Sequence, residues 1–123
     1  MFGNLKTLFG LGGAAVSPHE AVRRINAGAR VVDVREPEEY AQGSIANAVN
    51  VPLSRIDREG LAALDRAGIA HDHGELLIVC RSGARSGSAC TRLQSELGER
   101  AVNLQGGLMA WVGAGLPLQR ADR

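Results

Sequence analysis

Short apolar runs alternate along this chain with segments whose apolar residues recur at helical spacing. Four runs have the β-branched and apolar character of buried strands, at 31–34, 48–51, 76–79 and 101–104. The run at 76–79 is apolar at every position. A strand in the middle of a parallel sheet is buried on both faces, so we expect 76–79 to be the central strand.

The segments between these runs carry helix signals. Ser17 and Pro18 are typical of the start of a helix, and glycines are typical of helix ends. The spacing of apolar residues then predicts further helices, one with a single apolar face over 53–67, one over 89–97 and a short one over 108–112. A helix with acidic residues in its first turn is predicted near residue 37.

This alternation of strands and helices is typical of an α/β domain with a mostly parallel sheet and helices on both faces. The 123 residues fit one domain. We place it at 16–118, between an N-terminal tail at 1–15 and a C-terminal tail at 119–123. Phe2 and Phe9 lie in the N-terminal tail, where a flexible segment is favoured over a partner-binding or interfacial helix or a targeting segment.

Charge and cysteine usage narrow the possible partners. There are 14 Lys and Arg residues against 13 Asp and Glu, a formal net charge of +1, so electrostatics gives no reason to expect nucleic acid or an acidic membrane. The only cysteines, Cys80 and Cys90, are too few for a disulfide scaffold or a four-cysteine zinc site. Free thiols suit a reducing compartment, and we expect a cytoplasmic protein with no cofactor and no metal. His71, Asp72 and His73 are interpreted as a solvated connection rather than metal ligands.

The candidate chemistry follows the central strand directly, at the sheet edge where ligands of α/β proteins collect. The segment reads Cys80-Arg81-Ser82-Gly83-Ala84-Arg85-Ser86. A short loop with a glycine can turn its backbone N–H groups toward the sulfur, and the start of the next helix adds positive potential. Arg81 and Arg85 contribute two cations. These effects favour the thiolate of Cys80 over the thiol, and a purely structural cysteine does not require such neighbours.

Three residues outside the loop have weaker signals. Asp33 and Arg35 end a strand on the same side of the sheet as Cys80, where they can buttress the loop or pair with nearby glutamates. Cys90 lies on an apolar helix face, so burial is favoured over a role as a second redox thiol. Trp111 is expected to anchor the core or its rim.

The loop resembles the active-site loop of single-domain rhodaneses. Three more stretches are similar to that family, at 33–40, at 43–52, and at 106–111 with 115–117, so the resemblance covers about 16–118 in the right order. The chain departs from the family at Ser44, where histidine is usual, and at Asn47, where glycine is usual. Asparagine tolerates a left-handed backbone better than most residues, so we expect the fold to survive.

This resemblance implies a five-stranded parallel sheet flanked by helices and a sulfurtransferase activity. Cys80 would take the outer sulfur of thiosulfate or a related anionic donor and pass it, as a persulfide, to cyanide, a thiol or a protein acceptor. The amides of residues 81–86 would hold the persulfide, and Arg81 and Arg85 would orient the donor.

Other functions remain open at this point. One is a sulfur-relay or redox-sensing binding module that turns over little free thiosulfate. A cysteine phosphatase or an arsenate reductase is less favoured, because those enzymes place five residues between cysteine and arginine, whereas four separate Cys80 from Arg85.

Overall fold

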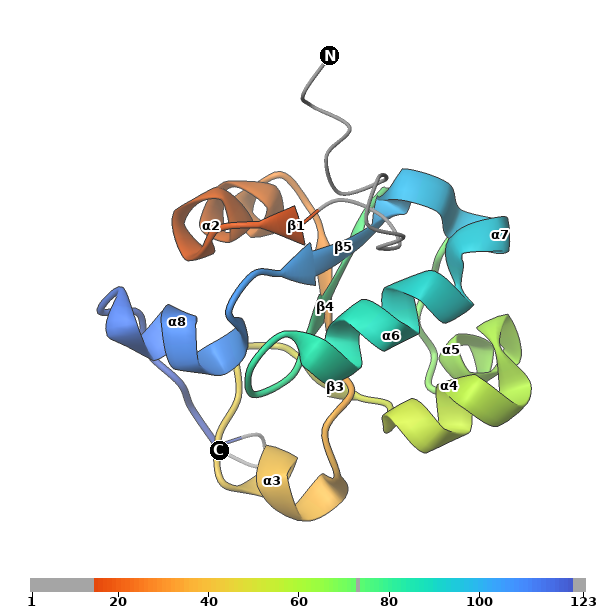
Figure 1. Cartoon of the computed structure of the whole chain (residues 1–123), viewed down its shortest axis with the longest axis horizontal. Coiled ribbons are helices and arrows are strands. Elements are labelled where there is room, and N and C mark those ends of the chain that lie inside the picture. Colours follow the sequence, from red (N-terminus) through yellow and green to blue (C-terminus); the bar gives the residue numbers. More distant parts are fainter. Residues whose placement is uncertain (1–14, 73, 121–123) are drawn as a thin grey trace.

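The computed structural model describes residues 15–72 and 74–120 and has three layers, with a sheet between two groups of helices (Figure 1). All strand pairs in the five-stranded sheet are parallel, in the order β1-β5-β4-β2-β3. The predicted α/β class is confirmed. The strands are β1 (Ala15–Val16), β2 (Arg30–Asp33), β3 (Val49–Asn50), β4 (Leu76–Val79) and β5 (Ala101–Leu104).

Helices cover both faces of this sheet. In Figure 1, α2 and α8 lie on one side of the strands and α4 to α7 lie on the other. None of the helices in the described ranges is long and apolar enough to cross a membrane. The helices are α2 (Pro18–Asn26), α3 (Pro37–Ala41), α4 (Leu53–Glu59), α5 (Leu61–Arg66), α6 (Ala84–Arg92), α7 (Gln94–Leu97) and α8 (Gly107–Gly113), with a 3-10 turn η2 (Gly98–Arg100).

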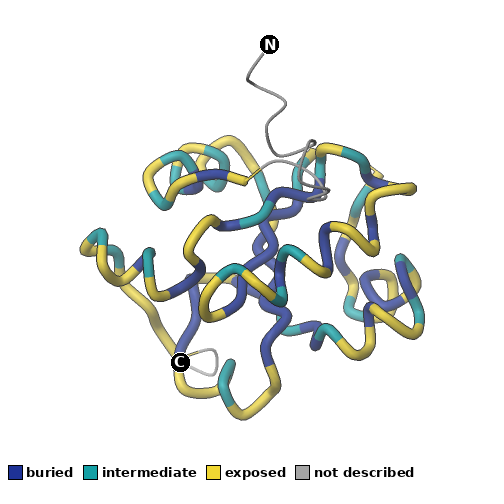
Figure 2. Tube along the Cα trace, viewed as in Figure 1, coloured by how far each residue is buried: buried dark blue, intermediate teal, exposed yellow. Residues whose placement is uncertain are grey.

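Strand β4 is the centre of the sheet, and all four of its residues are buried, as its sequence predicts (Figure 2). Side chains alternate between the two faces of a strand. Leu77 and Val79 pack with α2 and α8, whereas Ile78 packs with α4 to α6. Cys80 continues this alternation and lies with Ile78, so its sulfur is on the α6 side of the sheet.

The apolar face predicted as one helix over 53–67 belongs to two helices, α4 and α5. The chain breaks at Gly60, which has φ 60° and ψ −135°. The positive φ favours glycine there, whereas a Cβ would meet only the guanidinium of Arg92, at 2.9 Å, which is the end of a flexible side chain and can shift. Ile56 and Leu64 on either side of the break face the same core, so the apolar spacing continues across it.

The helix predicted over 89–97 is likewise two helices, α6 and α7. Leu93 leaves helical geometry, with φ −94° and ψ 3°, although its N–H still bonds the Ala89 carbonyl. Cys90, Leu93 and Leu97 all remain buried in one core. Their common face explains why the pattern of apolar residues predicts a single helix.

Short backbone pairings hold two segments near the ends of the described chain. The two-residue β1 pairs with β5 through Ala15 and Asn103, and no apolar pattern predicts so short a strand. Ser44 forms an antiparallel bridge with Gln119. The predicted N-terminal tail, apart from Ala15, lies outside the described residues. Asn47 has φ 68°, the left-handed conformation that an asparagine at this position was expected to tolerate.

Candidate active site

The sulfur of Cys80 lies within a ring of hydrogen-bond donors from the loop that follows β4. The amides of Gly83 and Ser86 lie 3.1 Å and 3.3 Å from Sγ, and the Ser86 hydroxyl lies 3.3 Å from it. Gly83 has φ 101°, which turns the chain tightly into α6. The loop therefore directs N–H groups at the sulfur, as the sequence predicts.

These donors change the acidity of the thiol. Burial is the largest single influence, and it raises the pKa of Cys80. Hydrogen bonds from the Ser86 hydroxyl and from the amides of Ser86, Gly83 and Ser82 together outweigh burial, so the pKa lies below its ordinary value of 9.0. The thiolate is consequently more abundant at neutral pH than it is for a free cysteine.

The first turn of α8 holds the outer side of the loop. The amides of Leu108 and Met109 donate to the carbonyls of Cys80 and Arg81, at 2.8 Å and 3.0 Å. In Figure 1, α8 lies beside the turn that leads into α6. Because α8 binds the loop carbonyls on one side, the loop amides are left to face the sulfur on the other.

Arg85 is held by an ion pair rather than left free. Its guanidinium donates to both carboxylate oxygens of Glu39, at 2.8 Å and 3.1 Å. Hydrogen bonds from Arg85 and then from the Glu36 amide lower the pKa of Glu39 to about 2. This pair ties α3 to α6 beside the loop and partly neutralises one of the two predicted cations.

Asp33 and Arg35 form a buried ion pair with each other, with Arg35 Nη2 at 2.8 Å from Asp33 Oδ2. The Ser44 hydroxyl donates to the same carboxylate oxygen at 2.6 Å, and Arg35 donates to the Gly43 carbonyl. Of the two alternatives that the sequence left open, pairing with a nearby glutamate is not the ion pair formed, since Arg35 pairs with Asp33, although its charge also lowers the pKa of Glu39. The network joins the segment after β2 to residues 43 and 44, and Arg35 lines the same open groove as Arg81.

Asn103 is a site residue that the sequence reasoning missed. Its side-chain oxygen accepts from the Ser86 hydroxyl at 2.6 Å, and its nitrogen donates to the Gly83 carbonyl at 3.2 Å. Asn103 stands opposite Ile78 in the pairing of β5 with β4, which brings it to the loop. The available signal was a polar residue inside an otherwise apolar strand.

Arg81 lies at the rim of the site. It is exposed, and its guanidinium makes no ion pair or hydrogen bond with any residue in 15–72 or 74–120. Ser82 and Ala84 are also exposed. Among the predicted site cations, Arg81 is therefore the one left without a carboxylate partner.

Cys90 and Trp111 belong to the core, as predicted. Burial first, and then the nearby Cys80, raise the pKa of Cys90 to about 12, so it stays a neutral thiol at neutral pH. Trp111 is buried and its indole N–H donates to the Pro117 carbonyl at 2.9 Å.

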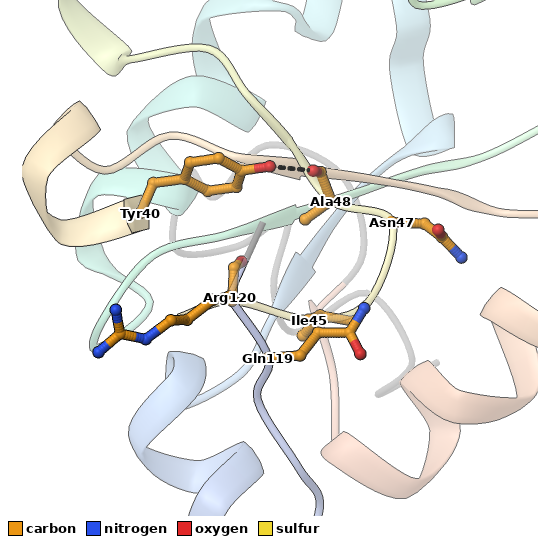
Figure 3. A pocket seen from close by; sticks show the side chains of 7 residues that line it. Tyr40, Ile45, Asn47, Ala48, Gln119 and Arg120 are labelled. Carbon is orange, nitrogen blue, oxygen red and sulfur yellow. Dashed lines mark hydrogen bonds between the residues drawn. The ribbon is translucent and has the colours of Figure 1, made fainter. Parts of the chain in front are cut away.

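A hollow of about 150 Å³ on the α3 side of the domain contains none of the loop residues (Figure 3). The Tyr40 hydroxyl spans part of it and donates to the Ala48 carbonyl at 2.6 Å. Ser44, also in its lining, is bound to Asp33. Both hydroxyls are therefore engaged, and the hollow offers no nucleophile.

Two histidines flank Asp72 in the connection before β4. His71 hydrogen-bonds Asp65 at 2.6 Å, and His73 lies outside the described residues. Within the described ranges no cluster of three His, Cys, Asp or Glu side chains could hold a metal ion.

Comparison with known proteins agrees with this geometry. The family model of the rhodanese-like domain matches residues 17–114. A sulfurtransferase of Allochromatium vinosum is 40% identical over 88 residues, which are 72% of this chain and 76% of that protein. A putative sulfurtransferase of Bacillus subtilis is 40% identical over 87 residues, 71% of this chain and 77% of its own length.

A solved structure shows the same fold. The crystal structure of a rhodanese-related protein from Thermoplasma volcanium aligns with a TM-score of 0.69 at 31% identity, over 86% of this chain and 97% of that one. The family match over most of the domain, the relatives and the cysteine loop lead to one conclusion: this chain belongs to the rhodanese-like domain family of sulfurtransferases.

Proposed function

We propose that this protein moves sulfane sulfur from thiosulfate, or a related anionic donor, to a thiophilic acceptor through a persulfide on Cys80. The observation that carries the proposal is the ring of donors around Sγ, from the Gly83 and Ser86 amides and the Ser86 hydroxyl. Such a ring stabilises a negative sulfur before and after it is loaded.

The reaction has two steps. The Cys80 thiolate attacks the outer sulfur of thiosulfate, the sulfur–sulfur bond of the donor breaks, and sulfite leaves with the electron pair. An acceptor such as cyanide then attacks the outer sulfur of the persulfide, thiocyanate leaves, and the thiolate is regenerated. Donor and acceptor react in turn, so ping-pong kinetics are expected, and neither step needs a metal or a cofactor.

The loop residues have different proposed roles in binding. The backbone of residues 81–86 cradles the outer sulfur, with the N–H groups of Ser82, Gly83 and Ser86 closest to the charge. Arg81, which has no carboxylate partner in the described chain, attracts the anionic donor. Arg85 holds the loop in place through its ion pair with Glu39. Its guanidinium is only partly neutralised by that pair, so it still adds positive potential at the site.

A second candidate is a sulfur relay that serves a dedicated acceptor protein and turns over little free thiosulfate. Cys80 has 0% exposed surface, so a donor reaches it only by entering the loop, and an open groove lies beside that loop. A phosphatase role is not supported, because the four residues between Cys80 and Arg85 make a smaller ring. Persistence of the thiolate favours a reducing compartment, so we place the activity in the cytoplasm.

The test compares the two cysteines in an assay of thiocyanate formation from thiosulfate and cyanide. Cys80→Ser should abolish turnover, since the hydroxyl does not form a persulfide. Cys90→Ala is the matched control and should keep most of the activity, because Cys90 is a buried neutral thiol. Turnover by Cys80→Ser would reject the mechanism. So would a folded Cys90→Ala variant that has lost its activity while Cys80→Ser keeps it.

A further inference from the structure

The exposed large hydrophobic side chains of the described chain gather in one place. They are Met109 (58% exposed), Val112 (52%) and Leu118 (37%). With Leu108 they line a single open groove of about 340 Å³. Scattered exposed apolar residues are ordinary on a soluble protein, whereas a gathered set marks a contact surface.

This groove adjoins the sulfur site. Arg81, the residue after Cys80, lines it together with the apolar side chains. The amide of Met109 donates to the Arg81 carbonyl at 3.0 Å, so the groove is joined directly to the loop. A molecule seated in the groove therefore has its neighbouring atoms at the entrance to the loop.

Charge at the groove has one sign. Arg35 also lines it, but the carboxylate of Asp33 is paired with that guanidinium. Arg81 is left with no carboxylate partner in the described ranges. The groove thus offers apolar contacts and one unpaired cation, and no carboxylate is among its lining residues.

The size of the groove indicates what fits. About 340 Å³ is at the low end of the roughly 300–1,000 Å³ of small-molecule sites. An open groove of this volume accepts one or two aliphatic side chains of a peptide segment. A small polar acceptor such as cyanide gains nothing from the apolar lining.

We infer that this groove docks the physiological sulfur acceptor, and that the acceptor is a protein segment in which a cysteine is flanked by aliphatic side chains and a carboxylate. The aliphatic side chains pack on Val112 and Leu118, and the carboxylate pairs with Arg81. The inference rests on the proposed function and names the acceptor that this site would serve. The acceptor thiolate attacks the outer persulfide sulfur, takes it as its own persulfide, and releases the Cys80 thiolate.

Three capped synthetic peptides test the inference. The first is Ser-Leu-Glu-Cys-Leu-Ser, the second has Lys in place of Glu, and the third has Ser in place of both Leu residues. Sulfur transfer from the thiosulfate-loaded protein is measured for each. Polarisation of labelled peptides with Ser in place of Cys measures binding without chemistry. We expect the first peptide to exceed both others about tenfold in kcat/KM and in affinity.

Variants assign the preference to the groove. Val112→Ser with Leu118→Ser should reduce the first peptide to the level of the third, while transfer to cyanide stays unchanged, since neither residue hydrogen-bonds the loop backbone. Arg81→Gln should abolish the preference for Glu over Lys. Val22→Ser is the matched control, since Val22 lines a different apolar groove between α2 and α8, and it should keep every preference.

The outcomes separate the two proposals. Equal rates and affinities for the three peptides, or a preference that survives Val112→Ser with Leu118→Ser, would overturn the docking surface while persulfide formation stands. If thiosulfate leaves no sulfur on the protein, the proposed function fails. The polarisation measurements then still decide the groove, with selective binding of the first peptide supporting it and equal binding overturning it.

Discussion

The Ser86 hydroxyl has one proton and two neighbours that can accept it. Asn103 Oδ1 lies at 2.6 Å and Cys80 Sγ at 3.3 Å. With a neutral thiol, the hydroxyl donates to Asn103 and accepts from the thiol. A thiolate can only accept a hydrogen bond, so the same hydroxyl stabilises it by donating to Sγ in place of Asn103. The Ser86 side chain thus connects the protonation state of Cys80 to Asn103 in β5.

Ser86→Ala removes this donor and should raise the pKa of Cys80, because burial would then be opposed by the amides alone. A hydrogen bond to a charged group contributes about 1.5–3 kcal/mol, so activity at acidic pH should fall roughly tenfold or more. Thiolate absorbance against pH measures the change. Ser88→Ala, at an exposed position of the same helix, is the control. An unshifted titration in Ser86→Ala would contradict this role.

Single residues also show what sequence reasoning could and could not reach. The loop was predictable because Cys80, Gly83 and the two arginines lie within six consecutive positions, and asparagine at position 47 was expected to be tolerated, which agrees with its φ of 68°. Asn103 was not, because its contact with Ser86 depends on the pairing of β4 with β5. The partner of Arg85 likewise comes from α3, 46 positions away.

At the scale of elements, α8 is the support on which the sulfur loop rests. Gly107 begins this helix with φ 63°, and a Cβ there would lie 2.6 Å from the Ser82 amide and closer still to the Arg81 carbonyl. Backbone cannot yield as a flexible side chain does. The approach of α8 to the loop therefore requires glycine at this position.

Gly107→Ala should displace the loop and lower kcat/KM about a hundredfold, because small misplacements of reacting groups are costly. It should also destabilise the fold by roughly 1–3 kcal/mol. Gly113→Ala is the matched control in the same helix, since a Cβ there meets nothing within 4 Å. Kinetics and thermal unfolding of both variants check this prediction, which normal activity in Gly107→Ala would refute.

The points at which helices end could not be predicted from the spacing of apolar residues. Apolar spacing located the buried faces correctly, but the breaks at Gly60 and Leu93 leave those faces continuous. Burial fixes which residues face the core. It does not fix whether one helix or two carry them.

At the scale of the whole molecule, Cys80 and Cys90 share one core on the α6 side of the sheet, yet their thiols have opposite pKa shifts. Cys80 ends the central strand among donors that lower its pKa, and Cys90 lies in the core, where burial raises its pKa to about 12. The α/β class and the central strand followed from the sequence pattern. The strand order and the short β1 depend on long-range pairing, which local patterns do not contain.

Cys90 should make the fold sensitive to alkali. Its pKa is near 9.0 in the unfolded chain and about 12 in the folded one, so above pH 9.0 the unfolded state binds fewer protons. The free energy of unfolding then falls with pH, by up to about 1.4 kcal/mol per unit from this group. Cys80 has the opposite sign, contributing fully above 9.0.

Denaturant unfolding at a series of pH values checks this linkage. Cys90→Ala should lose less stability than the wild type between pH 9.0 and about 12, since it lacks the buried thiol. Parallel curves for the two proteins would show that Cys90 does not titrate on unfolding.

The most direct measurement is the intact mass of the protein after incubation with thiosulfate and removal of the excess. The account predicts a gain of one sulfur atom, located at Cys80 by peptide mapping and lost on addition of cyanide. An unchanged mass, or a sulfur carried at Cys90 instead, would contradict it.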